Sequence, residues 1–130
     1  MDSVHVMVAI VRDAGGRFLI SQRGPGAHMA GAWEFPGGKK GPAETRLAAL
    51  ERELAEELGI TVVAAEPFIE ISHAYPDRRV RLDVWVVRDY RGEPGPLEGQ
   101  PLRWATIDDL AHTGLLEADR PIVAALRALG

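Results

Sequence analysis

Cysteine is absent from this chain of 130 residues. The absence excludes disulfides and thiolate metal sites, and it fits a reducing compartment. Aromatic residues make up only 6% of the sequence, and no stretch approaches the roughly 20 apolar residues of a membrane span. No excess of basic residues occurs either, because the formal net charge is -4, and this argues against a broad cationic surface for a nucleic-acid polymer.

The composition is that of a globular protein, with 46% hydrophobic and 26% charged residues, and its length suits one domain over residues 1–130. The start, MDSVHVMVAIVRD, lacks the basic leader and the small-residue cleavage site of a signal peptide, so we expect a cytoplasmic protein. We expect a small molecule as its partner, with no nucleic-acid polymer and no membrane, and a monomer or homodimer.

Apolar patterning predicts a mixed β-sheet with helices on both sides, an α/β fold. Strands are predicted at 4–10, 17–23, 32–35, 61–73, 80–89 and 102–105. Turn residues at 13–16 predict a hairpin between the first two strands, and a second hairpin joins the strand broken at Pro67 to its successor. Pro36-Gly37-Gly38 predicts a tight turn. Helices are predicted after a Thr106 cap and at 121–129.

The densest group of acidic residues lies in GKKGPAETRLAALERELAEELGI, at 38–60. The apolar spacing predicts a helix that ends at Gly59 in a left-handed cap. Successive helical residues turn by about 100°, so Glu53, Glu56 and Glu57 fall on one face. An adjoining arc holds the stripe predicted to be buried, which consists of Leu47, Leu50, Leu54 and Leu58.

Like charges on neighbouring turns of a helix repel one another, so helix stability does not favour this acidic cluster. A bound cation would relieve the repulsion. Hard divalent ions such as Mg²⁺ take oxygen ligands and often sit between carboxylates and the phosphates of a substrate. For the acidic pattern alone, a solvated helix face is the alternative.

The spacing through this segment resembles the Nudix box of the Nudix hydrolase family. Gly38 is followed after five residues by Glu44, and after seven more by Arg52-Glu53-Leu54-Ala55-Glu56-Glu57-Leu58-Gly59-Ile60. Other segments resemble the MutT branch, the pyrophosphohydrolases that remove oxidised guanine nucleotides from the precursor pool. They are AHMAGAWEFPGGK at 27–39, PDR at 76–78, GEP at 92–94 and EGQP at 98–101. The resemblance implies the Nudix fold, an α/β/α sandwich.

By this resemblance the chain hydrolyses a nucleoside triphosphate to the monophosphate and pyrophosphate with Mg²⁺, for which Mn²⁺ can substitute. Glu53 is then the base that accepts a proton from water, and Arg52 orients a carboxylate. The implied metal ligands are Gly38 through its carbonyl, Glu53, Glu56, Glu57 and Glu98. The implied substrate contacts are Arg23, His28, Glu34, Phe35, Lys39, Arg78 and Asp119.

The chain departs from the MutT pattern before the acidic helix, where relatives commonly have a Gly-Glu pair and a further acid. Here the loop reads Lys40-Gly41-Pro42-Ala43-Glu44. Pro42 suits a helix start, because its missing N–H is least costly there. We expect an altered loop with metal binding retained.

Asp119 also departs from the pattern, since it stands where the MutT pattern for 8-oxoguanine has an asparagine. Ionised aspartate only accepts hydrogen bonds, which favours a base with amino donors, such as cytosine. A related branch that acts on CTP and 5-substituted cytidine nucleotides carries Ala-Asp-x-Pro in this place. A protonated Asp119 could still serve 8-oxoguanine. The AHMAG, PDR and EGQP segments favour oxidised guanine, and cytidine nucleotides remain the alternative.

A hypothesis of another class is a non-catalytic nucleotide-binding module, because a fold does not fix a function. The intact acids at 53, 56 and 57 argue against it.

Overall fold

The computed structural model describes residues 3–129; Met1, Asp2 and Gly130, the ends of the predicted domain, lie outside the described residues. The elements are β1 (Ser3–Ile10), β2 (Phe18–Gln22), β3 (Trp33–Glu34), β4 (Gly37–Lys39), α1 (Arg46–Leu58), β5 (Thr61–Ala74), β6 (Arg79–Arg91), β7 (Leu102–Ala105), α2 (Ile107–His112), the short 3₁₀ helix η1 (Glu117–Asp119) and α3 (Arg120–Ala128).

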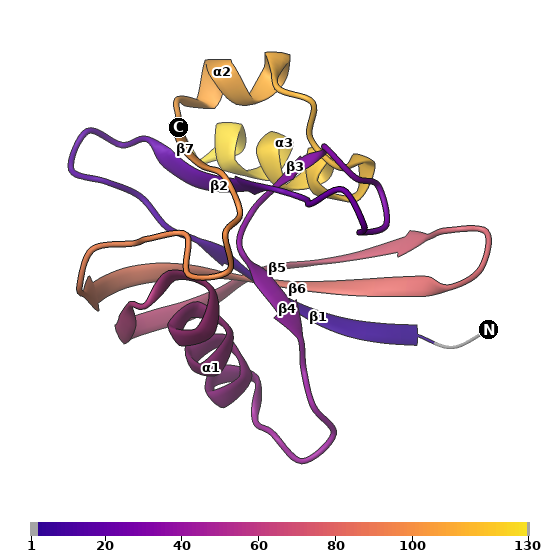
Figure 1. The fold of residues 1–130 in the computed structure, drawn as a ribbon, viewed down its shortest axis with the longest axis horizontal. Helices are drawn as coiled ribbons and strands as arrows, with labels where there is room; N and C mark the ends of the chain where they lie inside the picture. The colour runs from indigo at the N-terminus through magenta and orange to yellow at the C-terminus, as the bar shows by residue number, and fades with distance from the viewer. Residues whose placement is uncertain (1–2, 130) are drawn as a thin grey trace.

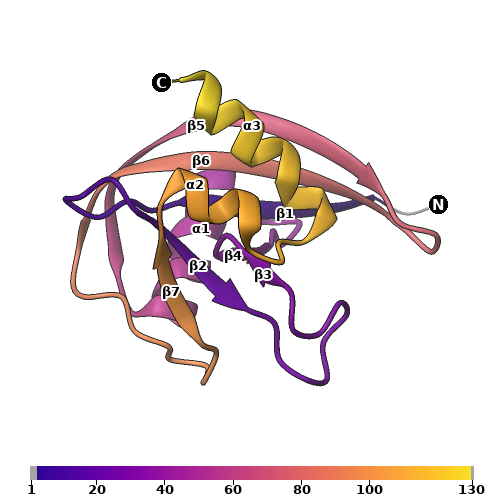
Figure 2. The ribbon, with the colours of Figure 1, turned by 90° about the horizontal axis from the view of Figure 1, so that it is seen from above.

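The predicted α/β/α layering is confirmed, but the strands form two sheets instead of one. A four-stranded mixed sheet has the order β4-β1-β6-β5, and a three-stranded sheet has the order β3-β2-β7. The helix α1 covers one face of the larger sheet, while α2 and α3 lie over the other face (Figures 1 and 2). None of the helices in residues 3–129 is long and apolar enough to cross a membrane.

Two hydrophobic cores follow from this layering, one on each face of the larger sheet. Met7 of β1 packs in the core that contains Leu54 of α1. The next residue, Val8, packs in the opposite core with Ile122 of α3. Successive side chains of a strand point to opposite faces, so a strand buried on both faces reads as a continuous apolar run. The run VMVAIV at the start of the chain is such a strand.

The predicted hairpin between the first two strands is only partly correct. The chain does reverse, since the Leu19 amide donates to the Val11 carbonyl at 2.9 Å and an isolated bridge joins Arg12 to Phe18. However, β1 pairs with β4 and β6, whereas β2 pairs with β3 and β7. The two strands diverge into separate sheets because both edges of each are taken by other strands.

Three local predictions around the acidic segment are wrong. Gly37 and Gly38 form β4 instead of a tight turn, and a Cβ at Gly37 would overlap the carbonyl oxygen of Met7. The helix starts at Arg46, with Thr45 as its N-cap, so Pro42 lies in the preceding loop. Leu47, predicted to be buried, is 40% exposed, because it lies in the first turn of α1 and the buried face of this helix starts only at Ala49 and Leu50.

The second predicted hairpin is confirmed, with β5 and β6 paired antiparallel. Pro67 does not end β5; it coincides with a register shift between Pro67 and Ile69. A proline is tolerated there because β5 is an edge strand. The left-handed cap at Gly59 (φ 70°) and the Thr106 cap of α2 are also confirmed.

A buried carboxylate fixes the start of α1 to the sheet. Asp83 on β6 is only 1% exposed and accepts bonds from Arg46 Nε at 2.6 Å, His5 Nε2 at 2.9 Å and Trp85 Nε1 at 2.9 Å. Burial opposes ionisation, but these hydrogen bonds prevail and hold the pKa of Asp83 at about 2. Because the positive end of a helix repels Arg46, the Asp83 carboxylate is what stabilises this residue in the first turn.

Replacing Asp83 by asparagine should lower the free energy of unfolding by about 2 to 3 kcal/mol at pH 7, because the charge-assisted bonds to Arg46 and His5 are lost inside the protein. Urea denaturation followed by circular dichroism measures this loss. Asp108→Asn is the matched control, since the pair of Asp108 with Arg127 is at the surface and should contribute less than about 1 kcal/mol. Equal stabilities for the two variants would contradict the anchoring role of Asp83.

Candidate active site

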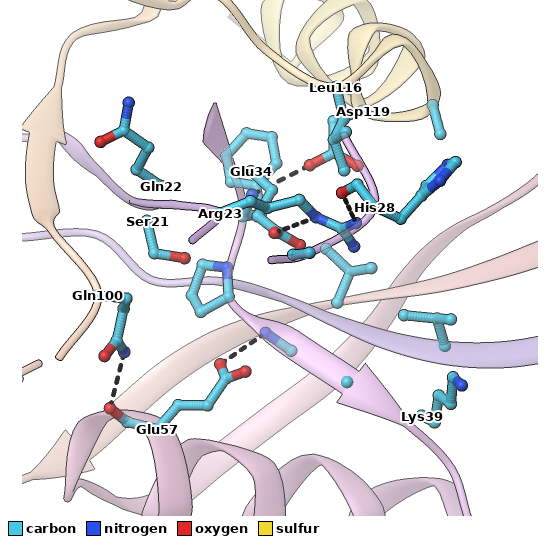
Figure 3. A pocket seen from close by; sticks show the side chains of 18 of the residues that line it. Ser21, Gln22, Arg23, His28, Glu34, Lys39, Glu57, Gln100, Leu116 and Asp119 are labelled. Carbon is cyan, nitrogen blue, oxygen red and sulfur yellow. Dashed lines mark hydrogen bonds and ion pairs between the residues drawn. The ribbon is translucent and has the colours of Figure 1, made fainter. Parts of the chain in front are cut away.

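A cavity of about 600 Å³ opens between the smaller sheet, β4 and the start of α3 (Figure 3). Predicted site residues that are far apart in the sequence line this cavity. They are Arg23, His28, Glu34, Phe35, Gly38, Lys39, Glu57, Arg78, Glu98 and Asp119. Arg52, Glu53 and Glu56 are outside the lining and lie along α1.

Asp119 lies at one end of the cavity, at the junction of η1 and α3. Its side chain is 4% exposed, and its Oδ2 accepts a hydrogen bond from the Phe35 amide at 3.0 Å. Burial raises the pKa of Asp119 to about 7, and the nearby Glu34 carboxylate adds to the increase. The carboxyl group is therefore divided between its neutral and ionised forms near neutral pH.

Arg23 at the end of β2 is held by two partners from other segments. Its Nε donates to Glu34 Oε2 at 2.6 Å, and its Nη1 donates to the backbone carbonyl of His28 at 2.5 Å (Figure 3). Burial raises the pKa of Glu34, and Arg23 partly offsets this effect. Arg23 thus enters the cavity as a fixed cation, which is suited to an anionic ligand.

Glu57 lies at the opposite end of the cavity, in the last turn of α1. Its Oε2 accepts from the Gly37 amide at 3.2 Å (Figure 3). Burial raises the pKa of Glu57 to about 8, and the carboxylates of Glu53 and Glu98 contribute to the increase. Glu53 and Glu57 of α1 and Glu98 of the 92–101 loop are therefore close enough for their charges to interact.

Glu53 packs directly beneath β4. A Cβ at Gly38 would overlap the carboxylate of Glu53, so a larger residue there would displace this carboxylate from the strand. Burial raises the pKa of Glu53 too, against the opposing effect of Arg52. The carboxylate of Glu53 and the backbone of Gly38 are thereby adjacent.

Arg52 is the cation of the acidic cluster. It donates to Glu44 at 2.6 Å and 2.9 Å, to Glu53 at 2.8 Å, to Glu56 at 3.3 Å and to the Lys39 carbonyl at 3.0 Å. The bonds from Arg52 hold the pKa of Glu44 at about 2. Glu44 is consequently an ion-pair partner of Arg52 in the loop before the helix, and Glu56 is exposed to solvent.

The donor set fits a hard divalent cation. In residues 3–129, no three carboxylate or imidazole side chains converge closely enough to hold a metal ion, since Glu53 turns to Arg52 and Glu57 to Gly37. Burial chiefly raises the pKa values of Glu53 and Glu57, and neighbouring carboxylates add to the increase, so ionising these acids together leaves negative charge without a full partner. A cation that takes oxygen ligands would compensate it.

Several lining residues were not singled out from the sequence. Tyr75 contacts the His28 ring edge-on at a centroid distance of 5.1 Å, and Leu116 and Gln100 also line the cavity. Tyr75 directly precedes the PDR segment and Gln100 lies within EGQP, so these segments were the available signal.

Arg78, which the sequence did single out, lines the cavity with a buried Nε that has no hydrogen-bond partner among the described residues.

Comparisons with known proteins agree with this geometry. A family model of the NUDIX domain matches residues 7–125. The chain is 37% identical over 129 residues to the 8-oxo-dGTP diphosphatase of Escherichia coli K12, covering 99% of this chain and 100% of that protein. It is 36% identical over 129 residues to the CTP pyrophosphohydrolase of the same organism, covering 99% of this chain and 95% of that one.

Similarity extends to solved structures. A MutT structure from a study of Aliivibrio salmonicida and Vibrio cholerae matches with a TM-score of 0.85 and 32% sequence identity, covering 99% of this chain and 100% of that one. Nudix hydrolases generally need a divalent metal ion, in agreement with the oxygen donors described above. The family match over most of the chain, together with these relatives, shows that this protein is a hydrolase of the NUDIX domain family.

Proposed function

We propose that this protein is a Mg²⁺-dependent nucleoside triphosphate pyrophosphohydrolase that acts on 8-oxo-dGTP, and that Mn²⁺ can replace Mg²⁺. The observation that carries the proposal is the two-ended cavity. One end holds the clustered carboxylates of Glu57 and Glu98 beside Glu53, and the other holds the buried Asp119. The carboxylates at the first end can hold a metal ion that binds the triphosphate, and Asp119 at the second end can hydrogen-bond to the nucleobase.

The residues that would hold Mg²⁺ are Gly38 through its carbonyl, Glu53, Glu56, Glu57 and Glu98. Bound there, the ion supplies charge neutralisation for the triphosphate oxygens. Lys39 faces the anionic part of the substrate, while Arg23 and His28 lie toward the Asp119 end and contact the nucleoside side of the substrate. Glu53 accepts a proton from the water that attacks a phosphorus, and the bond to Arg52 keeps Glu53 oriented. The products are nucleoside monophosphate and pyrophosphate.

Asp119 carries the choice of base, with the Phe35 backbone bonded to it and Arg78 lining the same cavity. A neutral carboxyl group offers a donor and an acceptor, as the asparagine of the MutT pattern does. Burial raises the pKa of Asp119 to about 7, so this neutral form is substantially populated near neutral pH. The burial of Asp119 therefore supports 8-oxo-dGTP as the substrate. A fully ionised Asp119, which only accepts hydrogen bonds, would instead favour cytosine.

A CTP pyrophosphohydrolase is the second candidate, because the E. coli relative of that name is 36% identical to this chain. In that case the ionised Asp119 accepts a hydrogen bond from the N4 amino group of cytosine.

Substituting either Glu53 or Glu57 by glutamine should lower kcat for pyrophosphate release by about 100-fold or more, since each variant removes a carboxylate from the metal cluster and the first also removes the general base. Pyrophosphate and phosphate are quantified separately with 8-oxo-dGTP as substrate. Chelation of the metal should abolish turnover, and added Mg²⁺ or Mn²⁺ should restore it.

Glu51→Gln is the matched control for these variants, because Glu51 lies exposed on the same helix and should leave the rate unchanged. If wild type released no pyrophosphate with Mg²⁺, the chain would instead be a nucleotide-binding module. If Glu53→Gln and Glu57→Gln turned over like Glu51→Gln, the assignment of the site would be wrong.

The preference for 8-oxo-dGTP over CTP should fall by up to about tenfold between pH 6 and pH 8.5, a difference of one hydrogen bond. The sign follows from the raised pKa of Asp119, about 7: the neutral, donating form prevails below this pH and the ionised, accepting form above it. The ratio of the two kcat/KM values, measured across this range, cancels pH effects on hydrolysis that are common to both substrates.

Asp119→Asn should show a ratio that does not change with pH, because the amide does not titrate. A pH-independent ratio in wild type, or the same dependence in Asp119→Asn, would exclude Asp119 as the discriminating group. A preference for CTP at every pH, weakened in Asp119→Asn, would establish the second candidate.

A further inference from the structure

The loop at 92–101, which joins β6 to β7 and carries Glu98, is fastened to the end of α1. The Gly95 amide donates to the Leu58 carbonyl at 3.0 Å, and the Leu97 amide donates to the Glu57 carbonyl at 3.1 Å. The last carbonyls of a helix have no partner within the helix, so the loop satisfies groups that would otherwise need water. These bonds come from backbone amides and do not depend on side-chain identity.

Gln100 adds a side-chain link between the same two segments. Its Nε2 donates to the Glu57 carbonyl at 3.0 Å (Figure 3), and its Oε1 accepts from the Glu98 amide at 3.0 Å. The side-chain amide of Gln100 therefore bonds to the backbone of Glu57 on the helix and to the backbone of Glu98 on the loop. Gln100 also lines the cavity that these acids face.

The position of Glu98 depends on this backbone link. Its side chain is exposed and makes no hydrogen bond or ion pair within residues 3–129. It nevertheless lines the same cavity as Glu57, one residue after Leu97, whose amide is bonded to the Glu57 carbonyl. With no side-chain contact to fix Glu98, the loop backbone must set its distance from the acids of α1.

We propose that Gln100 is a positioning residue for the metal site, which sets Glu98 of the loop against Glu57 of α1 so that both can ligate one divalent ion. This inference rests on the metal ligands proposed above. Gln100 touches neither the metal nor the reacting atoms; it acts through the backbone of the two acids. Residues that orient metal ligands commonly affect metal affinity by about 10- to 100-fold.

The test uses Gln100→Met, which keeps the length of the side chain and removes both hydrogen-bonding groups. Mn²⁺ affinity of the full chain without nucleotide is measured by titration calorimetry. We expect the affinity to fall by about tenfold or more. With 8-oxo-dGTP, the Mg²⁺ concentration for half-maximal rate should rise by a similar factor, while KM for the nucleotide at saturating Mg²⁺ stays within about twofold of wild type, since Gln100 holds ligands and not the base.

Thr113→Val is the matched control for the loss of a side-chain bond to a helix carbonyl. Thr113 Oγ1 donates to the Asp109 carbonyl at 2.8 Å at the end of α2, away from the acids of α1. This variant should lower the melting temperature without changing Mn²⁺ affinity. An equal fall in Mn²⁺ affinity in Thr113→Val and Gln100→Met would overturn the proposal, because general loosening would then explain both.

A double-mutant cycle with Glu98→Gln separates this inference from the proposed function. If Gln100 acts through Glu98, the Gln100 substitution should change Mn²⁺ affinity little once Glu98 is already replaced. Independent effects that multiply would overturn the positioning role. So would wild-type Mn²⁺ affinity in Glu98→Gln, because Glu98 would then not be a ligand, even though pyrophosphate release by the wild type would leave the proposed reaction standing.

Discussion

The close approach of Gly37 and Gly38 to their neighbours is the constraint on which the site depends. Gly37 lies against the Met7 carbonyl of β1, and Gly38 lies against the carboxylate of Glu53. A side chain at Gly37 would push β4 away from β1, and one at Gly38 would displace the Glu53 carboxylate. With both glycines in place, β4 pairs with β1 and its backbone lies next to the carboxylates of Glu53 and Glu57.

This packing concentrates negative charge that the fold compensates only in part. Arg52 pairs with Glu44, Glu53 and Glu56, yet the pKa of Glu57 is still raised to about 8, chiefly by burial. Burying carboxylates without full partners reduces stability, since the charged form is disfavoured there. Such a cost is typical of sites that are completed by a ligand, and a divalent ion would supply the missing charge.

The acidic helix and most strands could be predicted from the sequence, because their apolar residues recur with the regular periods of helices and strands. The division into two sheets could not, since alternation along β1 and β2 is the same whether they pair with each other or with other strands. The altered pKa of Asp119 depends on burial by segments distant in the chain. The role proposed for Gln100 could not be predicted either, because its hydrogen-bond partners are set only once the loop is placed on α1.

The two ends of the cavity are joined by one short stretch of backbone. The Phe35 amide donates to Asp119, and the Gly37 amide, two residues later, donates to Glu57 (Figure 3). Pro36 between them is buried, and its carbonyl accepts a bond from the Ala9 amide at 2.8 Å. Because this segment is held by these three hydrogen bonds, Asp119 and Glu57 keep a fixed separation. In the proposed binding mode, a nucleotide whose base is seated at Asp119 would have its triphosphate at the acidic end, so that recognition and hydrolysis would depend on the same piece of chain.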